Sequence, residues 1–136
     1  MTLADRIQTL PYKRLEEPRG WFQKPLTGKD SVPDSFGEIY AVQALKGEIR
    51  GNHYHEKAVE WFFVLAGSAT VYLQDVDTGE KEKKILTADE PTTLVIHPRV
   101  AHAFVNENEE PFILVAYTDV LFDPVDTIPF ELAKKA

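Results

Sequence analysis

Short runs of apolar residues, separated by turn-forming residues, predict that this chain is all-β. The apolar residues recur with the two-residue period of strands, and no long helical period or internal repeat is present. About ten short strands with a turn roughly every eight to twelve residues are typical of an antiparallel sandwich or barrel. The expected strands cover residues 12–16, 21–26, 37–45, 49–55, 59–65, 69–75, 81–86, 92–96, 102–106 and 112–118.

The sequence predicts a specific structure for four further segments. Residues 1–10 predict a short helical turn that ends at Pro11, and residues 130–135 predict a short terminal helix. Residues 29–36 predict a loop. The charged residues 81–86 predict a strand at the edge of a sheet, where charge discourages further pairing.

The strand expected to begin at Glu60 has an apolar outer face that another part of the protein must cover. If Glu60 faces the interior of a barrel, the opposite face carries a large apolar row: Trp61, Phe63 and Leu65. Such a row is unfavourable in water, so either another sheet of the same chain or another subunit must cover it. Because residues 37–45 are also apolar on both faces, we expect a two-fold homodimer.

Length and charge narrow the possible partners. The 136 residues suit a single domain over residues 1–136, with its core at about residues 15–120. A net charge of -7 and a pI near 5.1 leave no basic stripe for nucleic acid. No apolar run is long enough for a transmembrane helix, and the N-terminus has no signal-peptide pattern. Without cysteine there are no disulfides or thiolate ligands, which fits a cytoplasmic protein.

The candidate chemistry lies in residues 47–67, GEIRGNHYHEKAVEWFFVLAG. His53 and His55 are two apart, so both side chains point to one face of a strand, and Glu60 begins the next strand. Two imidazoles and a carboxylate suit a divalent metal, most favourably zinc, with manganese, iron and nickel as alternatives. The fourth ligand must come from elsewhere, and the remaining histidines are His97 and His102.

The spacing of these residues resembles that of the cupin superfamily. Gly47, His53, His55, Glu60 and Gly67 match its first motif at every position. Pro98, His102 and Asn106 are similar to a compact second motif that lacks its usual glycine, and the resemblance makes His102 the remaining ligand. It implies a cupin double-stranded β-helix, or jelly-roll barrel.

Two further segments narrow the resemblance. Residues 19–22 (RGWF) and 46–53 (KGEIRGNH) resemble the dTDP-4-dehydrorhamnose 3,5-epimerase family. Residues 50–55, 121–124 and 126–127 are closer to the C-terminal cupin domain of bifunctional capsular polysaccharide epimerase-reductases. The resemblance implies that Arg19, Phe22 and Arg50 bind substrate, the two arginines at the pyrophosphate. Because Arg50 is three residues from His53, a bend at Gly51 is needed to bring both to one cleft.

The catalytic residues are harder to transfer from these relatives. In the metal-free rhamnose-pathway enzymes a histidine at the position of His53 is catalytic, but a glutamine and a lysine stand where this chain has His55 and Glu60. The family's catalytic tyrosine falls at Val115, and Tyr117, on the same strand face, could replace it. If His53 holds a metal, the base could instead be Tyr117, Glu56 or a metal-bound hydroxide.

The function expected from these features is isomerase activity. We predict a metal-dependent epimerase or isomerase that acts on a nucleotide-linked 4-keto sugar in surface polysaccharide biosynthesis. The metal would act as a Lewis acid on the sugar carbonyl while a base removes the neighbouring proton. Two alternatives remain: a cupin dioxygenase with three histidines and one glutamate around iron or nickel, and a non-catalytic sugar-binding cupin.

Overall fold

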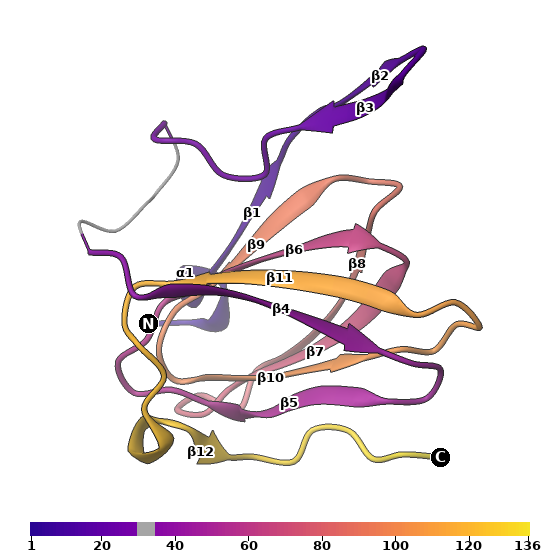
Figure 1. The fold of residues 1–136 in the computed structure, drawn as a ribbon. Helices are drawn as coiled ribbons and strands as arrows, with labels where there is room; N and C mark the ends of the chain where they lie inside the picture. The colour runs from indigo at the N-terminus through magenta and orange to yellow at the C-terminus, as the bar shows by residue number, and fades with distance from the viewer. Residues whose placement is uncertain (30–34) are drawn as a thin grey trace.

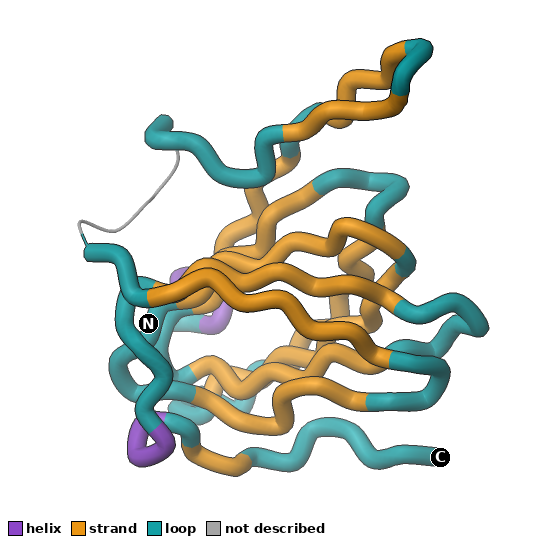
Figure 2. The backbone as a smooth tube through the Cα atoms, viewed as in Figure 1, coloured by secondary structure: helices purple, strands orange, loops and turns teal. Residues whose placement is uncertain are grey.

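A computed structural model describes residues 1–29 and 35–136, and within them two antiparallel five-stranded sheets pack face to face (Figures 1 and 2). The first sheet has the order β1 (Ile7–Pro11), β9 (Thr92–Ile96), β6 (Glu60–Ala66), β11 (Phe112–Thr118), β4 (Glu38–Ala44). The second has the order β12 (Ile128–Pro129), β5 (Ile49–Tyr54), β10 (Val100–Val105), β7 (Ser68–Asp75), β8 (Lys81–Thr87). The other elements are a hairpin of β2 (Arg14–Glu17) and β3 (Gly20–Gln23), helix α1 (Leu3–Arg6) and the 3₁₀ turn η1 (Pro124–Asp126).

The core lies between the two sheets. Phe62 of β6 and Phe104 of β10 meet there with ring centroids 4.7 Å apart, and both are almost fully buried. Burying a side chain of this size stabilises the fold by about 1.5–3 kcal/mol. The predicted all-β jelly-roll class is therefore confirmed.

Most predicted strands are present, and β8 lies at the edge of its sheet as expected. The prediction of a terminal helix is wrong: residues 130–135 form no helix, and the preceding β12 pairs with β5. The backbone N–H groups of Leu132 and Ala133 donate to the side chain of Asn52, which holds this tail extended. The first helical turn ends at Arg6, because residues 7–11 pair with β9. Residues 30–34 of the predicted loop lie outside the described residues.

The apolar row on the outer face of β6 is covered largely within the chain. Trp61 is only 3% exposed and packs edge-on against Tyr117, with ring centroids 5.4 Å apart. Phe63 and Leu65 are half-buried. The row is therefore largely covered within the chain and does not by itself require a second subunit.

The predicted bend at Gly51 is present as a β-bulge. His102 of β10 pairs with His53, but the next residue, Ala103, pairs with Gly51, so that Asn52 is the extra residue. Gly51 has φ +100° and Asn52 has φ +61°, both in the left-handed region. The bulge brings Arg50 and His53 to the lining of one cavity, although strict alternation would place them on opposite faces.

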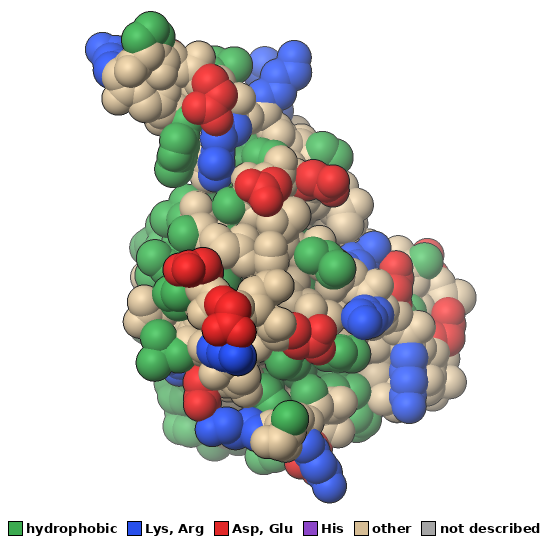
Figure 3. Space-filling model, turned by 90° about the vertical axis from the view of Figure 1, so that its right-hand side faces the viewer, with side chains coloured by type: hydrophobic (Ala, Val, Ile, Leu, Met, Phe, Trp, Pro, Cys, Tyr) green, Lys and Arg blue, Asp and Glu red, His purple; other side chains and the backbone are tan. Residues whose placement is uncertain are grey.

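The hairpin of β2 and β3 stands away from the two sheets (Figures 1 and 3). It leaves three large apolar side chains about half exposed: Leu15, Trp21 and Phe22.

No helix in residues 1–29 and 35–136 has the length and apolar character needed to cross a membrane.

Candidate active site

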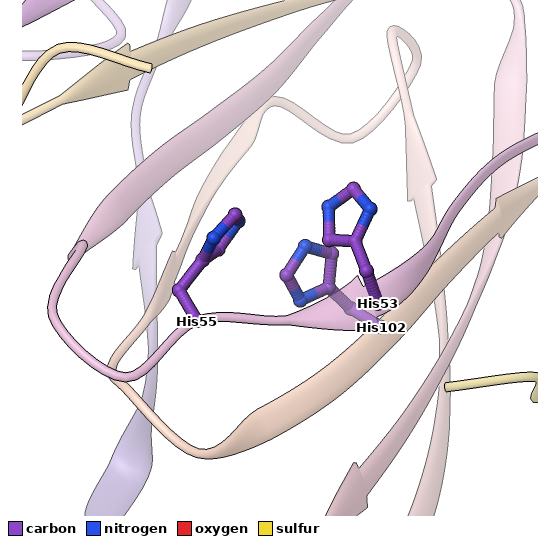
Figure 4. A group of neighbouring side chains, drawn as sticks. All are labelled: His53, His55 and His102. Atoms are coloured by element: carbon purple, nitrogen blue, oxygen red, sulfur yellow. The ribbon is translucent and has the colours of Figure 1, made fainter. Parts of the chain in front are cut away.

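Three histidines converge between the sheets (Figure 4). His53 lies in β5 and His55 directly follows that strand, while His102 comes from the neighbouring strand β10, directly opposite His53. The ring centroid of His53 is 4.9 Å from those of both His55 and His102. One nitrogen of each ring lies within 4.8 Å of the others, so together they could hold one metal ion.

Backbone carbonyls set the orientation of two of the rings. Nδ1 of His55 lies 2.9 Å from the carbonyl oxygen of Asp126, and Nδ1 of His102 lies 3.0 Å from that of Val100. A carbonyl can only accept a hydrogen bond, so each Nδ1 must carry the proton. In the neutral rings this leaves the Nε2 lone pairs free, which is the arrangement found in metal-ligating histidines.

Glu60 completes a group of buried, unpaired polar atoms. Its Oε1 lies 3.0 Å from Nε2 of His55 and 3.5 Å from Nε2 of His102, and none of these three buried atoms makes a hydrogen bond. Ligands about 2.0–2.1 Å from a tetrahedral zinc ion lie roughly 3.3 Å from one another. The spacing of these atoms therefore fits a shared cation, which would satisfy all three.

The charges of the group favour the same conclusion. Burial and the neighbouring His102 and His55 lower the pKa of His53 to about 4, and burial also lowers the pKa of His102. Burial opposes ionisation of both His55 and Glu60, yet their attraction wins: the pKa of His55 is raised and that of Glu60 is lowered. Two neutral imidazoles therefore lie beside a His55–Glu60 pair that attracts positive charge, and a bound cation would supply that charge.

Two cavities meet at this group. The larger, of about 330 Å³, is lined by Tyr40, by the group His53, His55 and Glu60, and by parts of residues 118–127. The smaller, of about 210 Å³, shares Tyr40 and His53 and extends along β4 and β5 to Arg50. The guanidinium of Arg50 donates through Nε and Nη2 to the carbonyl oxygen of Gln43, which links the two strands there. The histidines thus lie midway along a cleft between β4 and β5.

Other predicted site residues lie elsewhere. The ring of Tyr117 packs on Trp61 and Phe36 on the outer face of β11, and its hydroxyl donates to the carbonyl oxygen of Ser35. The buried neighbours Leu114 and Ala116 face the core. Tyr117 alternates with them and therefore faces outward, so its predicted place in the site is wrong.

The substrate-binding pair from residues 19–22 is also distant from the cleft of its own chain. Arg19 and Phe22 belong to the projecting hairpin, where Arg19 forms an exposed ion pair with Glu17. Glu56, a candidate base, is held by both carboxylate oxygens to Arg99. His97, the alternative fourth ligand, is absent from the histidine group and from the lining of both cavities.

Two residues of the site were not predicted from the sequence. The hydroxyl of Tyr40 donates to Oε2 of Glu60 at 3.0 Å. Asp126 was noticed only as part of a tail similar to that of relatives, yet it contacts both His55 and the loop that follows it. Tyr40 could have been suspected because it alternates with Glu38 and Val42 on a predicted strand, whereas no local signal marks Asp126.

The fold and the buried histidine group define a cupin-type protein. The chain belongs to the polysaccharide biosynthesis C-terminal domain family, which it matches over residues 17–128. It is 25% identical over 127 residues to the spore coat polysaccharide biosynthesis protein SpsL of Bacillus subtilis (strain 168), covering 90% of this chain and 84% of that protein.

Solved structures with the same fold include sugar-nucleotide enzymes. A dTDP sugar isomerase from Desulfovibrio desulfuricans G20 has a TM-score of 0.83 at 21% identity, covering 95% of this chain and 84% of its own. The capsular polysaccharide assembling protein CapF from Staphylococcus aureus has a TM-score of 0.68 at 21% identity, covering 90% of this chain but 33% of CapF. Others are 4-keto-6-deoxy sugar epimerases and 3,4-ketoisomerases. The resemblance inferred from the sequence motifs is confirmed.

Proposed function

We propose that this chain is a metal-dependent epimerase or isomerase of a nucleotide-linked 4-keto sugar, acting in surface polysaccharide biosynthesis. One observation carries the proposal: the unpaired atoms Nε2 of His55, Nε2 of His102 and Oε1 of Glu60 converge beside a cavity. The names of the similar proteins support the substrate class and the pathway.

His53, His55, Glu60 and His102 would hold about one divalent ion per chain. Zinc is the first candidate, because imidazole and carboxylate ligands in this number suit it, and manganese, iron and nickel are the others. When bound, such an ion supplies a Lewis acid that polarises the carbonyl of the sugar and favours loss of the proton beside it.

Tyr40 and Arg50 would act on the substrate from β4 and β5. Burial, together with the Glu60 carboxylate beside it, raises the pKa of Tyr40, so its hydroxyl stays protonated. While it donates to Glu60, its oxygen can accept a hydrogen bond from a sugar hydroxyl. Arg50 lies at the other end of the same cleft, where its planar guanidinium suits bidentate binding of a phosphate.

His53 is the remaining candidate base among the residues considered. Tyr117 faces away from the cleft, and Glu56 is paired with Arg99. With a pKa of about 4, His53 is unprotonated at neutral pH and able to accept a proton. It can do so only if it is not a metal ligand, so its two roles exclude each other and can be separated by experiment.

The test of the proposal is exchange of sugar protons with solvent. The protein is incubated in deuterated water with a dTDP- or UDP-4-keto-6-deoxyhexose, and the C3 and C5 protons are followed by NMR. We expect exchange that disappears on chelation and in His55→Ala, and that persists in His97→Ala, the matched control outside the site.

The other outcomes assign other functions. Exchange that survives chelation but is lost in His53→Ala would mean a metal-free histidine base. No exchange, with oxygen consumption on an enediol by the iron-loaded protein, would favour a dioxygenase. Thermal stabilisation by a nucleotide sugar, with neither activity, would leave a binding protein.

We also propose that the chain forms a homodimer, in which a second copy covers the projecting hairpin. A two-stranded hairpin is marginally stable alone, and this one exposes Leu15, Trp21 and Phe22. We expect light scattering to give twice the mass of one chain, and the double variant Trp21→Ser, Phe22→Ser to give a monomer. Ile85→Ser, at an exposed apolar residue on β8, serves as the control. A monomeric wild-type protein at micromolar concentration would exclude the dimer.

A further inference from the structure

Asp126 lies in a segment that crosses one end of the cleft. We call residues 119–129 the C-terminal strap: it leaves β11, passes through η1 and pairs with β5 through β12 (Figure 1). Asp126 ends η1 and is 8% exposed, an unusual position for a carboxylate unless it has specific partners.

The side chain of Asp126 binds three consecutive backbone amides. Its Oδ1 accepts from the N–H groups of Glu56 and Lys57 at 2.8 and 3.1 Å, and its Oδ2 accepts from Ala58 at 3.3 Å. These amides belong to the loop that follows His55 and connects β5, which carries His53, with β6, which begins at Glu60. One carboxylate therefore fixes the connection between three of the four proposed ligands.

The backbone of Asp126 acts directly on one ligand. Its carbonyl oxygen is the acceptor for Nδ1–H of His55, the contact that leaves Nε2 free towards Glu60 and His102. The side chain and the carbonyl of a single residue thus determine both the path of the loop and the orientation of the ring.

The strap is itself anchored on both sides of Asp126. Before it, Oδ1 of Asp119 accepts from the N–H of Val59, and the N–H of Phe122 donates to Oε1 of Glu38. After it, Ile128 pairs with Tyr54, and Pro129 pairs with His53. Asp126 is therefore held by the first sheet and by β5 independently of any bound ion.

We infer that Asp126 is a positioning residue: it holds His55 in the ligand orientation and sets the loop between β5 and β6. Only the expected effect of Asp126 on metal affinity rests on the proposed metal function. Hydrogen bonds that orient metal ligands commonly account for 10- to 100-fold in metal affinity. The side chain adds a negative charge 3.9 Å from Nδ1 of His55, which also favours a nearby cation.

The probe is cobalt(II), whose visible absorption reports the geometry of its ligands. We expect Asp126→Ala to weaken cobalt binding about 10- to 100-fold and to change the spectrum. The variant keeps the backbone carbonyl but removes the three hydrogen bonds that hold the loop after His55 in place against it, so the ring can move away from its ligand orientation. Asp126→Asn keeps an oxygen acceptor for two of the amides and should give an intermediate loss, and it also serves if Asp126→Ala does not fold.

The matched control is Asp75→Asn. Asp75 is likewise a buried carboxylate that accepts from two turn amides, those of Asp77 and Thr78, but it lies outside both cavities of the site. We expect this control to lower the melting temperature while cobalt affinity stays within about twofold, well below the effect of a ligand-orienting residue.

A second measurement needs no metal. In the metal-free protein, at a pH where His55 is neutral, ¹⁵N NMR of the imidazoles should place its proton on Nδ1 in the wild type. In Asp126→Ala it should be divided between the Nδ1 and Nε2 tautomers, because the released loop no longer holds the ring against the backbone carbonyl of residue 126. If the wild type bound no cobalt, the metal proposal would fail, while the tautomer of His55 would still decide the role of Asp126. If Asp126→Ala kept both the tautomer and the cobalt affinity and only melted earlier, Asp126 would be a structural cap and the inference would be overturned.

Discussion

Replacing His102 with alanine is expected to lower metal affinity by more than about 100-fold, beyond the effect of a residue that only orients a ligand. His102 is 1% exposed, and its Nε2 points at Glu60 from a strand whose other side chains are also buried. Without this ring the carboxylate of Glu60 keeps its contact with His55 but loses one of the two imidazoles beside it. No other histidine can replace the ligand, because the fourth histidine, His97, is not part of the group.

Metal content by elemental analysis and cobalt affinity by titration would measure the loss. His97→Ala removes an imidazole without touching the site and should retain full occupancy. Because a buried residue is changed, the far-ultraviolet circular dichroism of His102→Ala must match that of the wild type. His55→Ala, at a less buried position, provides a second variant. Equal metal in the wild type and in both folded variants would refute the proposed ligand set.

Replacing Gly51 with alanine is expected to destabilise the protein by about 2–4 kcal/mol, because strain and a steric clash act together. Gly51 has φ +100°, which side chains rarely adopt, and a Cβ there would lie 2.7 Å from the carbonyl oxygen of His102. The clash must move either β5 or β10; these strands carry His53 and His102, and His55 directly follows β5. Metal affinity should therefore fall together with stability.

The variant Gly79→Ala measures the cost of backbone strain in the absence of a steric clash. Gly79 has φ +79° in the turn between β7 and β8, and a Cβ there would meet no atom within 4 Å. We expect this control to cost about 1 kcal/mol, the strain alone, and to leave metal affinity unchanged. Denaturant unfolding measures both variants. Equal costs at Gly51 and Gly79 would mean that the bulge relaxes freely and does not fix the site.

The sequence by itself was sufficient for the all-β class and for the group of His53, His55 and Glu60. Strand alternation is a local property: residues two apart share a face whatever the strand packs against. The prediction that Gly51 must bend the strand also succeeded, because it followed from the same parity. His102 could be chosen over His97 only through the resemblance to the cupin motif.

Only the tertiary structure decided features that depend on register between distant segments. β11 is apolar on both faces, so its sequence does not say that Leu114 and Ala116 face inward and Tyr117 outward; pairing with β4 and β6 decides this. The tail after β12 could form a helix locally, but hydrogen bonds to Asn52 hold it extended. Asp126 reaches His55 across 71 residues of sequence. Contacts of this range are set by packing the whole chain, and no local pattern encodes them.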